Sequence, residues 1–356
     1  MSGGPYITPR ALIGSPRAKD AVAAQQAWAF LGPARAFAAI DVTTVQGRAS
    51  TALMTRPAYD NALACASPLT GRAMDAALAA LGAPRPAFVG LDLSATRIMG
   101  IVNVTPDSFS DGGKFADTDA AIAHGLKLAE EGADIIDVGG ESTRPGADPV
   151  APDDEQRRVI PVVRALAEKG LCVSIDTRHA ATMGAAIATG ARIVNDVTAL
   201  ADPAALKTVA PTAVSVILMH MQGDPRTMQK DPTYVWAPGD VFDMLAGRLK
   251  ACQGAGIAAD RIAVDPGIGF GKTETHSAQI LTHLALYHGL GCAVVVGASR
   301  KRLIAAFSQG EPAEARLPGS LSIALTAAEQ GVQIVRVHDV KETRQALAVR
   351  RMVSSV

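Results

Sequence analysis

The sequence predicts an α/β protein whose main part is an eight-stranded parallel (β/α)8 TIM barrel. Eight short apolar runs, each bounded by turn residues, alternate with helical patterns from residue 97 onward. Such runs are typical of strands buried on both faces, and their alternation with helices favours parallel connections. The span of about 260 residues is close to the roughly 250 typical of such a barrel. A doubly wound open sheet is the alternative, but it usually needs fewer strands.

The apolar runs and the helical patterns between them define the expected elements. The expected strands are Ile98–Val102, Ile135–Val138, Cys172–Ile175, Arg192–Val194, Val214–Met219, Ile262–Val264, Ala293–Val296 and Gln333–Val337. Apolar residues at helical spacing predict helices over Thr118–Glu130, Asp153–Ala167, Val241–Cys252, Gln279–Leu286, Leu321–Ala328 and Lys341–Met352. We therefore assign residues 96–356 to one catalytic barrel.

Residues 1–95 differ from the rest of the chain. They are rich in Ala, Pro and Arg, and their periodicity is weak. Phe37–Val45 is typical of a strand, and Arg72–Leu81 of a short helix that ends before Pro84. The stretch Gly82–Pro86 reads as a linker. Because this part contains no catalytic constellation, we interpret it as a small N-terminal α+β appendage that packs on the barrel.

Composition excludes several classes of function. Charged residues make up 19% of the chain and the formal net charge is zero, so no basic surface points to nucleic acid or an anionic membrane. The four cysteines are scattered without CxxC spacing, which argues against a zinc site or a disulfide framework. No apolar run approaches the roughly 20 residues of a membrane span. A cytoplasmic location is expected, with an organellar transit peptide as the alternative.

Polar residues follow the expected strands at the point where each strand ends. The stretch Ile98–Gly113, IMGIVNVTPDSFSDGG, passes from an apolar run into a polar loop, and GGESTRPG follows the next strand. Later strands end in or lead to Asp176, Asn195, His220, Asp265, Ser299 and His338. The carboxyl ends of barrel strands surround one mouth, where active sites lie. We therefore expect these side chains to meet there.

Some of these residues have a structural interpretation as well as a functional one. An Asp after a strand is often only the N-cap of the next helix, and for Asp196 and Asp339 the two interpretations stay equally open. For Asp176 and Asp265 a ligand role is favoured, because both end strongly apolar strands. His220 is interpreted as a supporting residue.

Two other features look functional but are not expected to be. GIGFGKT resembles a phosphate loop, but Pro266 stands where a Walker loop needs glycine, so nucleotide hydrolysis is not expected. His276, His283 and His288 are interpreted as residues of a solvated helix face and not as metal ligands.

The chemistry of the mouth suits a phosphorylated heterocycle. Cations expected at the rim of the mouth, where they can converge on one phosphate or pyrophosphate, are Arg144, Lys301, Arg336 and His338. Hydrogen-bonding groups expected deeper in the mouth are Asp176, Asn195 and Asp265. Carboxylates there match an edge with two adjacent donors, such as a 2-aminopyrimidinone. Asn103, with a nearby carboxylate such as Asp111, is suited to hold Mg²⁺ that also binds phosphate oxygens.

Eight motifs of this region resemble those of the dihydropteroate synthase family of pterin-binding barrels. They are MGIVNVTPDSFSDGG, GGESTRPG, SIDT, NDV, MHMQG, DPGIGFGKT, GASRK and RVHDV, in this order, each after its strand. The resemblance runs from about Arg97 to the C-terminus and leaves out the appendage. Ile268 stands where an aromatic residue is common and Ala298 where Thr is common.

The resemblance implies a reaction and a set of site residues. In that reaction p-aminobenzoate displaces pyrophosphate from 6-hydroxymethyl-7,8-dihydropterin diphosphate, giving 7,8-dihydropteroate for folate synthesis. The implied pterin-binding residues are Asp176, Asn195, Asp265 and Lys301. The implied diphosphate site consists of Arg336 and His338, next to Val337, with Asn103 as the ligand of Mg²⁺. The implied aminobenzoate site consists of Phe109, Thr143, Arg144, Pro145, Phe270 and Ser299. A homodimer is also implied.

The residues expected to act in catalysis are Asp111, Arg144, Lys301, Arg336 and His338. Two rival functions remain. A pterin-binding methyltransferase of the corrinoid type has no diphosphate to hold, so SRK, RVH and ESTRPG argue against it. A non-catalytic pterin-binding paralogue is disfavoured by the intact Lys301, Arg336 and His338.

Overall fold

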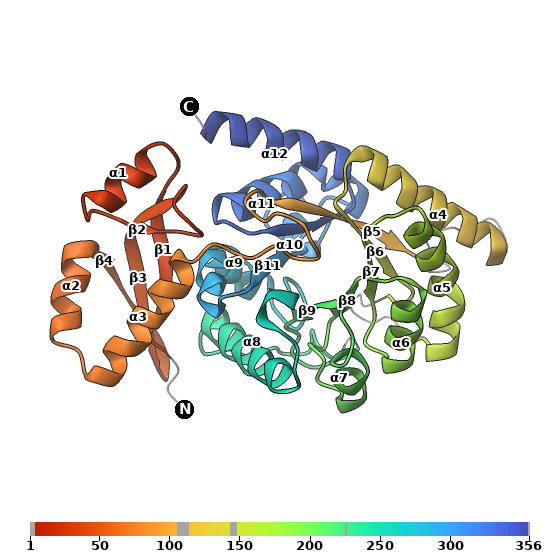
Figure 1. The fold of residues 1–356 in the computed structure, drawn as a ribbon, viewed down its shortest axis with the longest axis horizontal. Helices are drawn as coiled ribbons and strands as arrows, with labels where there is room; N and C mark the ends of the chain where they lie inside the picture. Colours follow the sequence, from red (N-terminus) through yellow and green to blue (C-terminus); the bar gives the residue numbers. More distant parts are fainter. Residues whose placement is uncertain (1–3, 105–113, 143–147, 225, 355–356) are drawn as a thin grey trace.

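The computed structural model of the chain describes residues 4–104, 114–142, 148–224 and 226–354 (Figure 1). Its main part is a closed barrel of eight strands, in which every neighbouring pair is parallel. The predicted (β/α)8 barrel is therefore confirmed. An open sheet is excluded because the sheet closes on itself.

The barrel strands lie within two residues of their expected positions. They are β5 (Arg97–Asn103), β6 (Ile135–Gly139), β7 (Val173–Asp176), β8 (Ile193–Asp196), β9 (Ser215–Met219), β10 (Ile262–Asp265), β11 (Ala293–Val296) and β12 (Ile334–Val337). Most of their residues are buried. The apolar runs located the strands well because parallel strands in a barrel are covered on both faces.

The helices were harder to predict than the strands. Those of the barrel are α4 (Lys114–Glu131), α5 (Pro152–Glu168), α6 (Ala180–Thr189), α7 (Pro203–Val209), α8 (Ala237–Gly254), α9 (Glu274–Leu281), α10 (Arg302–Ala306), α11 (Leu317–Glu329) and α12 (Val340–Ser354), with the 3₁₀ helices η2 (Ala259–Arg261), η3 (Leu284–Leu290) and η4 (Ala313–Ala315). The sequence missed α6, α7 and α10. The sequence of α6, AATMGAAIAT, has small and apolar residues on all sides and so shows no polar face. The helix expected over Gln279–Leu286 is two elements, because Thr282 and His283 both hydrogen-bond back to Gln279 O and end α9.

Two layers of side chains inside the barrel differ in chemistry. The apolar layer consists of Met99, Ile135, Ile193, Ile217, Ala263, Ala293, Val295 and Ile334, packed with Phe88 and Leu93 from the segment before β5. Strand side chains alternate between faces, so the residue two positions further along also points inward. The polar layer that results consists of Asp137, Asn195, Asp265 and Arg336, two residues after Ile135, Ile193, Ala263 and Ile334.

The appendage is an α+β unit beside the barrel, coloured red to orange in Figure 1. It contains β1 (Tyr6–Ile13), α1 (Arg17–Ala23), β2 (Trp28–Ala29), β3 (Ala36–Gln46), β4 (Arg48–Thr55), α2 (Arg56–Ala64) and α3 (Pro68–Gly82). The expected strand corresponds to β3 and the expected helix to α3. The four strands form one antiparallel sheet around β3. The sequence missed β4 because six of its eight residues are exposed, so it has no alternating apolar pattern.

The appendage contacts the barrel through aromatic rings and hydrogen bonds. The Tyr6 hydroxyl donates to Asp243 Oδ2 at 2.7 Å, and the Tyr6 ring lies 5.3 Å from that of Trp236. Arg85, just after α3, donates from Nε to Cys292 O at 3.0 Å. Further along, Phe88 packs into the apolar layer, so part of the segment assigned to the appendage belongs to the barrel core.

The interpretation of His288 as part of a solvated helix face is wrong. Its side chain is buried, its Nε2 lies 3.0 Å from Gln330 O, and its ring meets the Phe30 ring of the appendage edge-on. Burial lowers its pKa to about 3, so this histidine is neutral. The sequence around His288 could not reveal this, because the covering residue comes from a distant part of the chain.

Among the described helices, none is both long and apolar enough to cross a membrane.

Candidate active site

The strand register brings predicted site residues to one level of the barrel mouth. Asn103 on β5 pairs with Gly139, Gly139 with Asp176, and Asp176 with Asn195 on β8. A Cβ atom at Gly139 would lie 3.5 Å from Asp176 Cβ, so the missing side chain leaves room beside the carboxylate. Asn103, Asp176 and Asn195 therefore line one side of the mouth, as the sequence predicted.

Arg336 lies among the acceptors and not at the rim where it was expected. Its Nε donates to Asp137 Oδ2 at 2.6 Å, and its Nη2 donates to Asp176 Oδ2 at 2.7 Å. Asn195 Nδ2 also donates to Asp137 Oδ2, at 3.2 Å. The guanidinium thus joins one carboxylate from β6 and one from β7, and reaches past β5, the strand between β12 and β6. It is held in place before any ligand binds.

Burial shifts the pKa of Asp176. Burial raises this pKa to about 7, Arg336 opposes the shift, and the neighbouring Asp137 and Glu155 add to it. A carboxyl with a pKa near neutrality exchanges a proton readily and is typical of functional sites. Burial thus favours the protonated form of Asp176, whereas its ion pair with Arg336 favours the carboxylate.

Asp265 is fixed by the turn that follows β10. Its Oδ1 accepts from Gly267 N at 2.7 Å, and Gly267 has φ +66°, a conformation that favours glycine. A Cβ at Gly267 would lie 1.9 Å from His220 O, so no other residue fits there. Burial raises the Asp265 pKa, and Lys301 opposes the shift. Oδ2 is the carboxylate oxygen left for a ligand.

Lys301 bridges the same turn and the mouth. Its Nζ donates to Ile268 O and lies 4.4 Å from the centre of the Phe270 ring, a cation–π contact. Burial lowers its pKa to about 8, while Asp265 acts in the opposite direction. At pH 7 most of these side chains are ammonium ions, so a positive charge stands beside an apolar ring.

His220 is a supporting residue, as the sequence suggested. Its Nδ1 lies 2.8 Å from Lys272 Nζ, and Lys272 also donates to Phe270 O at 2.9 Å. Burial and Lys272 lower the His220 pKa to about 3, so the imidazole is neutral. This pair ties the end of β9 to the turn that holds Asp265 and Phe270.

The remaining predicted residues of β11 and β12 lie close together. Ser299 Oγ is 3.0 Å from His338 Nδ1, and His338 directly follows the buried Val337. Asp339 forms an ion pair with Arg300. Asp196 accepts from Thr198 N at 2.7 Å and from Leu200 N at 2.8 Å, so it organises its own loop. For both acids the structural interpretation is favoured.

Several predictions fall outside the described residues. They concern Phe109, Asp111, Thr143, Arg144 and Pro145, and they stay predictions.

Sequence reasoning missed Asp137 and Lys272. Asp137 is the only charged residue in the apolar strand run IIDVG, and Lys272 ends the DPGIGFGK motif. A charge inside an apolar strand run, two residues after an inward-facing Ile, was the available signal for Asp137. For Lys272 the sequence offered none, because a lysine after a glycine-rich turn is usually exposed, whereas this one is 2% exposed.

Known proteins match the barrel, the part of the chain that carries the candidate site. A family model for pterin binding enzymes matches residues 99–338. The chain is 46% identical over 260 residues to the dihydropteroate synthase of Escherichia coli (strain K12), covering 73% of this chain and 92% of that one. It is 47% identical over 263 residues to that of Neisseria meningitidis serogroup C, with the same coverage of both.

Solved structures agree with the sequence relatives. The Xanthomonas albilineans dihydropteroate synthase with 4-aminobenzoic acid superposes with a TM-score of 0.71 at 48% identity, over 75% of this chain and 96% of that one. The X. albilineans enzyme in complex with 7,8-dihydropteroate gives a TM-score of 0.67 at 42% identity, with the same coverage of both. Since the family model spans more than half of the chain and begins after the appendage, the chain belongs to the family of pterin binding enzymes.

Proposed function

We propose that this protein is a dihydropteroate synthase, which joins 6-hydroxymethyl-7,8-dihydropterin diphosphate to p-aminobenzoate and releases pyrophosphate. The observation that carries the proposal is the polar layer, where carboxylates, an amide and a guanidinium replace the apolar filling of the barrel. Relatives that share this barrel are dihydropteroate synthases, one of them solved with 4-aminobenzoic acid and one with 7,8-dihydropteroate.

The polar layer supplies the groups that a pterin requires. Asp265 Oδ2 accepts from the amino group and ring N–H of the pyrimidinone edge, while Gly267 holds the other oxygen. The Asn195 amide and the Lys301 ammonium are suited to the remaining ring atoms. Because these groups are fixed before binding, little side-chain entropy is lost when the pterin enters.

The reaction needs a departing diphosphate more than a strong base. The methylene beside the dihydropterin ring shares positive charge with the ring as the C–O bond breaks, and the neutral aniline nitrogen then attacks this carbon. The nitrogen finally loses one proton to water, which gives the neutral product. We expect Lys301, His338 and Arg336 to neutralise the leaving group.

We further propose Mg²⁺ as the cofactor. The Asn103 side chain stands at the end of β5 beside the mouth, and its amide oxygen is a hard donor that suits Mg²⁺. One or two protein ligands are enough, because Mg²⁺ keeps several waters and takes phosphate oxygens from the substrate. When bound, this ion supplies positive charge to the diphosphate. A homodimer and a cytoplasmic location remain part of the proposal.

The test is release of pyrophosphate from purified protein. We expect release to require the pterin diphosphate, p-aminobenzoate and Mg²⁺ together, with 7,8-dihydropteroate formed in equal amount. Binding of the pterin diphosphate without any turnover would favour the non-catalytic paralogue and contradict the proposal. Lys301→Met serves as the inactive control, since it removes the ammonium but keeps most of the length of the side chain.

A further inference from the structure

A buried carboxylate oxygen without a partner lies beside the mouth. Glu155 is in the first turn of α5, and its side chain is 0% exposed. Its Oε2 accepts from Thr177 Oγ1 at 2.8 Å and lies 3.0 Å from His179 Nδ1. Its Oε1 has no hydrogen-bond partner among the described residues. Leaving a buried acceptor unpaired is unfavourable, so such an oxygen calls for a ligand.

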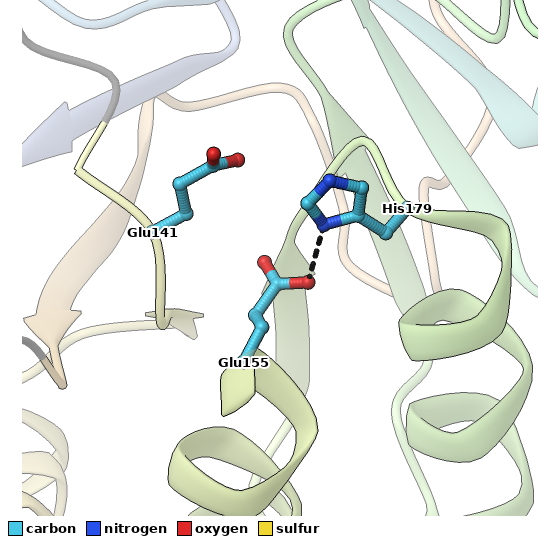
Figure 2. Close-up of side chains that lie close together, drawn as sticks. All are labelled: Glu141, Glu155 and His179. Atoms are coloured by element: carbon cyan, nitrogen blue, oxygen red, sulfur yellow. Dashed lines mark hydrogen bonds and ion pairs between the residues drawn. The ribbon is translucent and has the colours of Figure 1, made fainter. Parts of the chain in front are cut away.

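Two more side chains with metal-binding atoms face the same space. Glu141 follows β6, and His179 is the N-cap residue of α6. One possible ligand atom from each of Glu141, Glu155 and His179 lies within 4.8 Å of the others. Figure 2 shows the second oxygen of Glu155 directed toward the space below Glu141, with the His179 ring on the other side. The three residues come from three different elements that meet at this point.

The charges around this space favour a cation. Arg178 donates to both oxygens of Glu141, at 2.9 and 3.0 Å, and compensates one negative charge. Among the described residues, His179 is the only titratable side chain that contacts a Glu155 oxygen. The formal charges of Glu141, Glu155 and Arg178 therefore leave one net negative charge. The Glu141 side chain is only 5% exposed, so water screens this charge poorly.

We propose that Glu141, Glu155 and His179 bind a divalent first-row metal ion, Zn²⁺ or Mn²⁺, separate from the Mg²⁺ that we place at Asn103. Two carboxylates and one imidazole are a common ligand set for these ions, whereas Mg²⁺ prefers oxygen ligands alone. Ligand atoms around one tetrahedral ion lie roughly 3.4 Å apart. The three side chains therefore move together by about 1 Å on binding, and the ion replaces the proton between His179 and Glu155.

The ion has a structural task in this position. It joins the connection after β6, which carries Glu141, to the connection after β7, which carries His179. Thr177, which donates to Glu155, directly follows Asp176 of the mouth. The site thus holds the backbone next to Asp176 without touching the substrate. This inference does not depend on the proposed reaction.

The experiment is calorimetric titration of Zn²⁺ and of Mn²⁺ into the full chain, stripped with a chelator and free of diphosphate. We expect one ion per chain and weaker binding of Mg²⁺. His179→Gln and Glu155→Gln should each lower the affinity at least about tenfold. The matched control is His338→Gln, which removes an imidazole from the mouth and should leave the titration unchanged. Zn²⁺ should also raise the Tm of the wild type and not that of His179→Gln.

Three results would overturn the proposal. One is no binding by the wild type at up to about 1 mM metal, an affinity too weak to matter. Another is unchanged binding by both His179→Gln and Glu155→Gln, which would place the ion elsewhere. The third is loss of binding in His338→Gln or Asn103→Ala, which would place it in the mouth. If Glu155→Gln fails to fold by circular dichroism, His179→Gln and Glu141→Gln decide.

Discussion

The apolar layer and the polar layer of the barrel lie on the same strands, two residues apart, but one serves stability and the other serves function. Ile135 and Ile193 are fully buried among aliphatic side chains, and Phe88 closes the layer from below. Asp137 and Asn195, two residues further along the same strands, are buried too, but they contact a guanidinium and other polar groups. The fold thus separates stability from function along a single strand.

The polar layer costs stability that the apolar layer supplies. Burial raises the pKa of Asp265 in this layer. Beside the layer, burial raises the pKa of Asp176 and lowers that of Lys301, so each of these charges is less stable here than in water. Asp137 Oδ1 is buried without a hydrogen-bond partner among the described residues. Buried groups of this kind persist where they serve a ligand. The comparison predicts that changes in one layer affect binding and changes in the other affect folding.

The largest effect on binding is expected for Asp265→Asn. Gly267 N–H selects the amide oxygen of the new side chain, so its NH₂ replaces Oδ2 and faces the pterin donors. A charge-assisted hydrogen bond is worth roughly 1.5–3 kcal/mol, and a mispaired buried donor adds a similar cost. We expect the affinity for pterin diphosphate to fall by roughly two to three orders of magnitude. Calorimetry on protein with a native circular dichroism spectrum measures this; near wild-type affinity would remove Asp265 from the site.

The opposite result is expected for Ile135→Ala in the apolar layer. This side chain is 0% exposed, and its removal leaves a cavity under the polar layer. Such substitutions lower the free energy of unfolding by about 2–5 kcal/mol. Urea unfolding measures the loss, and pterin diphosphate affinity of the folded variant should stay within about threefold of wild type, less than 0.7 kcal/mol. A large loss of affinity would show that the two layers are coupled.

A smaller effect is expected from pH. Asp176 has a pKa of about 7 and Lys301 of about 8. Below pH 7 Asp176 becomes protonated and loses an acceptor for the pterin, and above pH 8 Lys301 loses its charge. Affinity for pterin diphosphate should therefore be highest between pH 7 and 8 and fall by up to about tenfold per pH unit on either side. Asp176→Asn should abolish the fall in affinity below pH 7 and leave the fall above pH 8. An unchanged fall below pH 7 would contradict the assignment.

The sequence predicted some residues of the barrel correctly and misplaced others, for physical reasons. The residues at strand ends, such as Asp176 and Asp265, were found because polar groups contrast with the apolar runs before them. Arg336 was found but placed at the rim, since the sequence does not show that Asp137 and Asp176 come within hydrogen-bond distance of its guanidinium. His288 was expected to be solvated because the residue that covers it, Phe30, comes from the appendage. Local contrast is visible in a sequence, whereas a contact between distant segments is not.

The smallest effect on catalysis is expected from removing the appendage. A truncation up to about Leu91 would remove Phe88 from the apolar layer, so the cleaner cut is after Gly82, the last residue of α3. This cut keeps Arg85 and its hydrogen bond to Cys292 O.

The appendage contacts the outside of the barrel through Tyr6 and Phe30 and supplies no described residue to the mouth. We therefore expect kcat within about threefold of the full chain, below about 0.7 kcal/mol in activation free energy. The Tm should fall, because Trp236 and Leu286 lose their cover. Tyr6→Phe, which removes only the hydroxyl bonded to Asp243, is the mild control. A folded truncation that binds pterin diphosphate normally but has no turnover at saturating substrate would show that the appendage takes part in the chemistry.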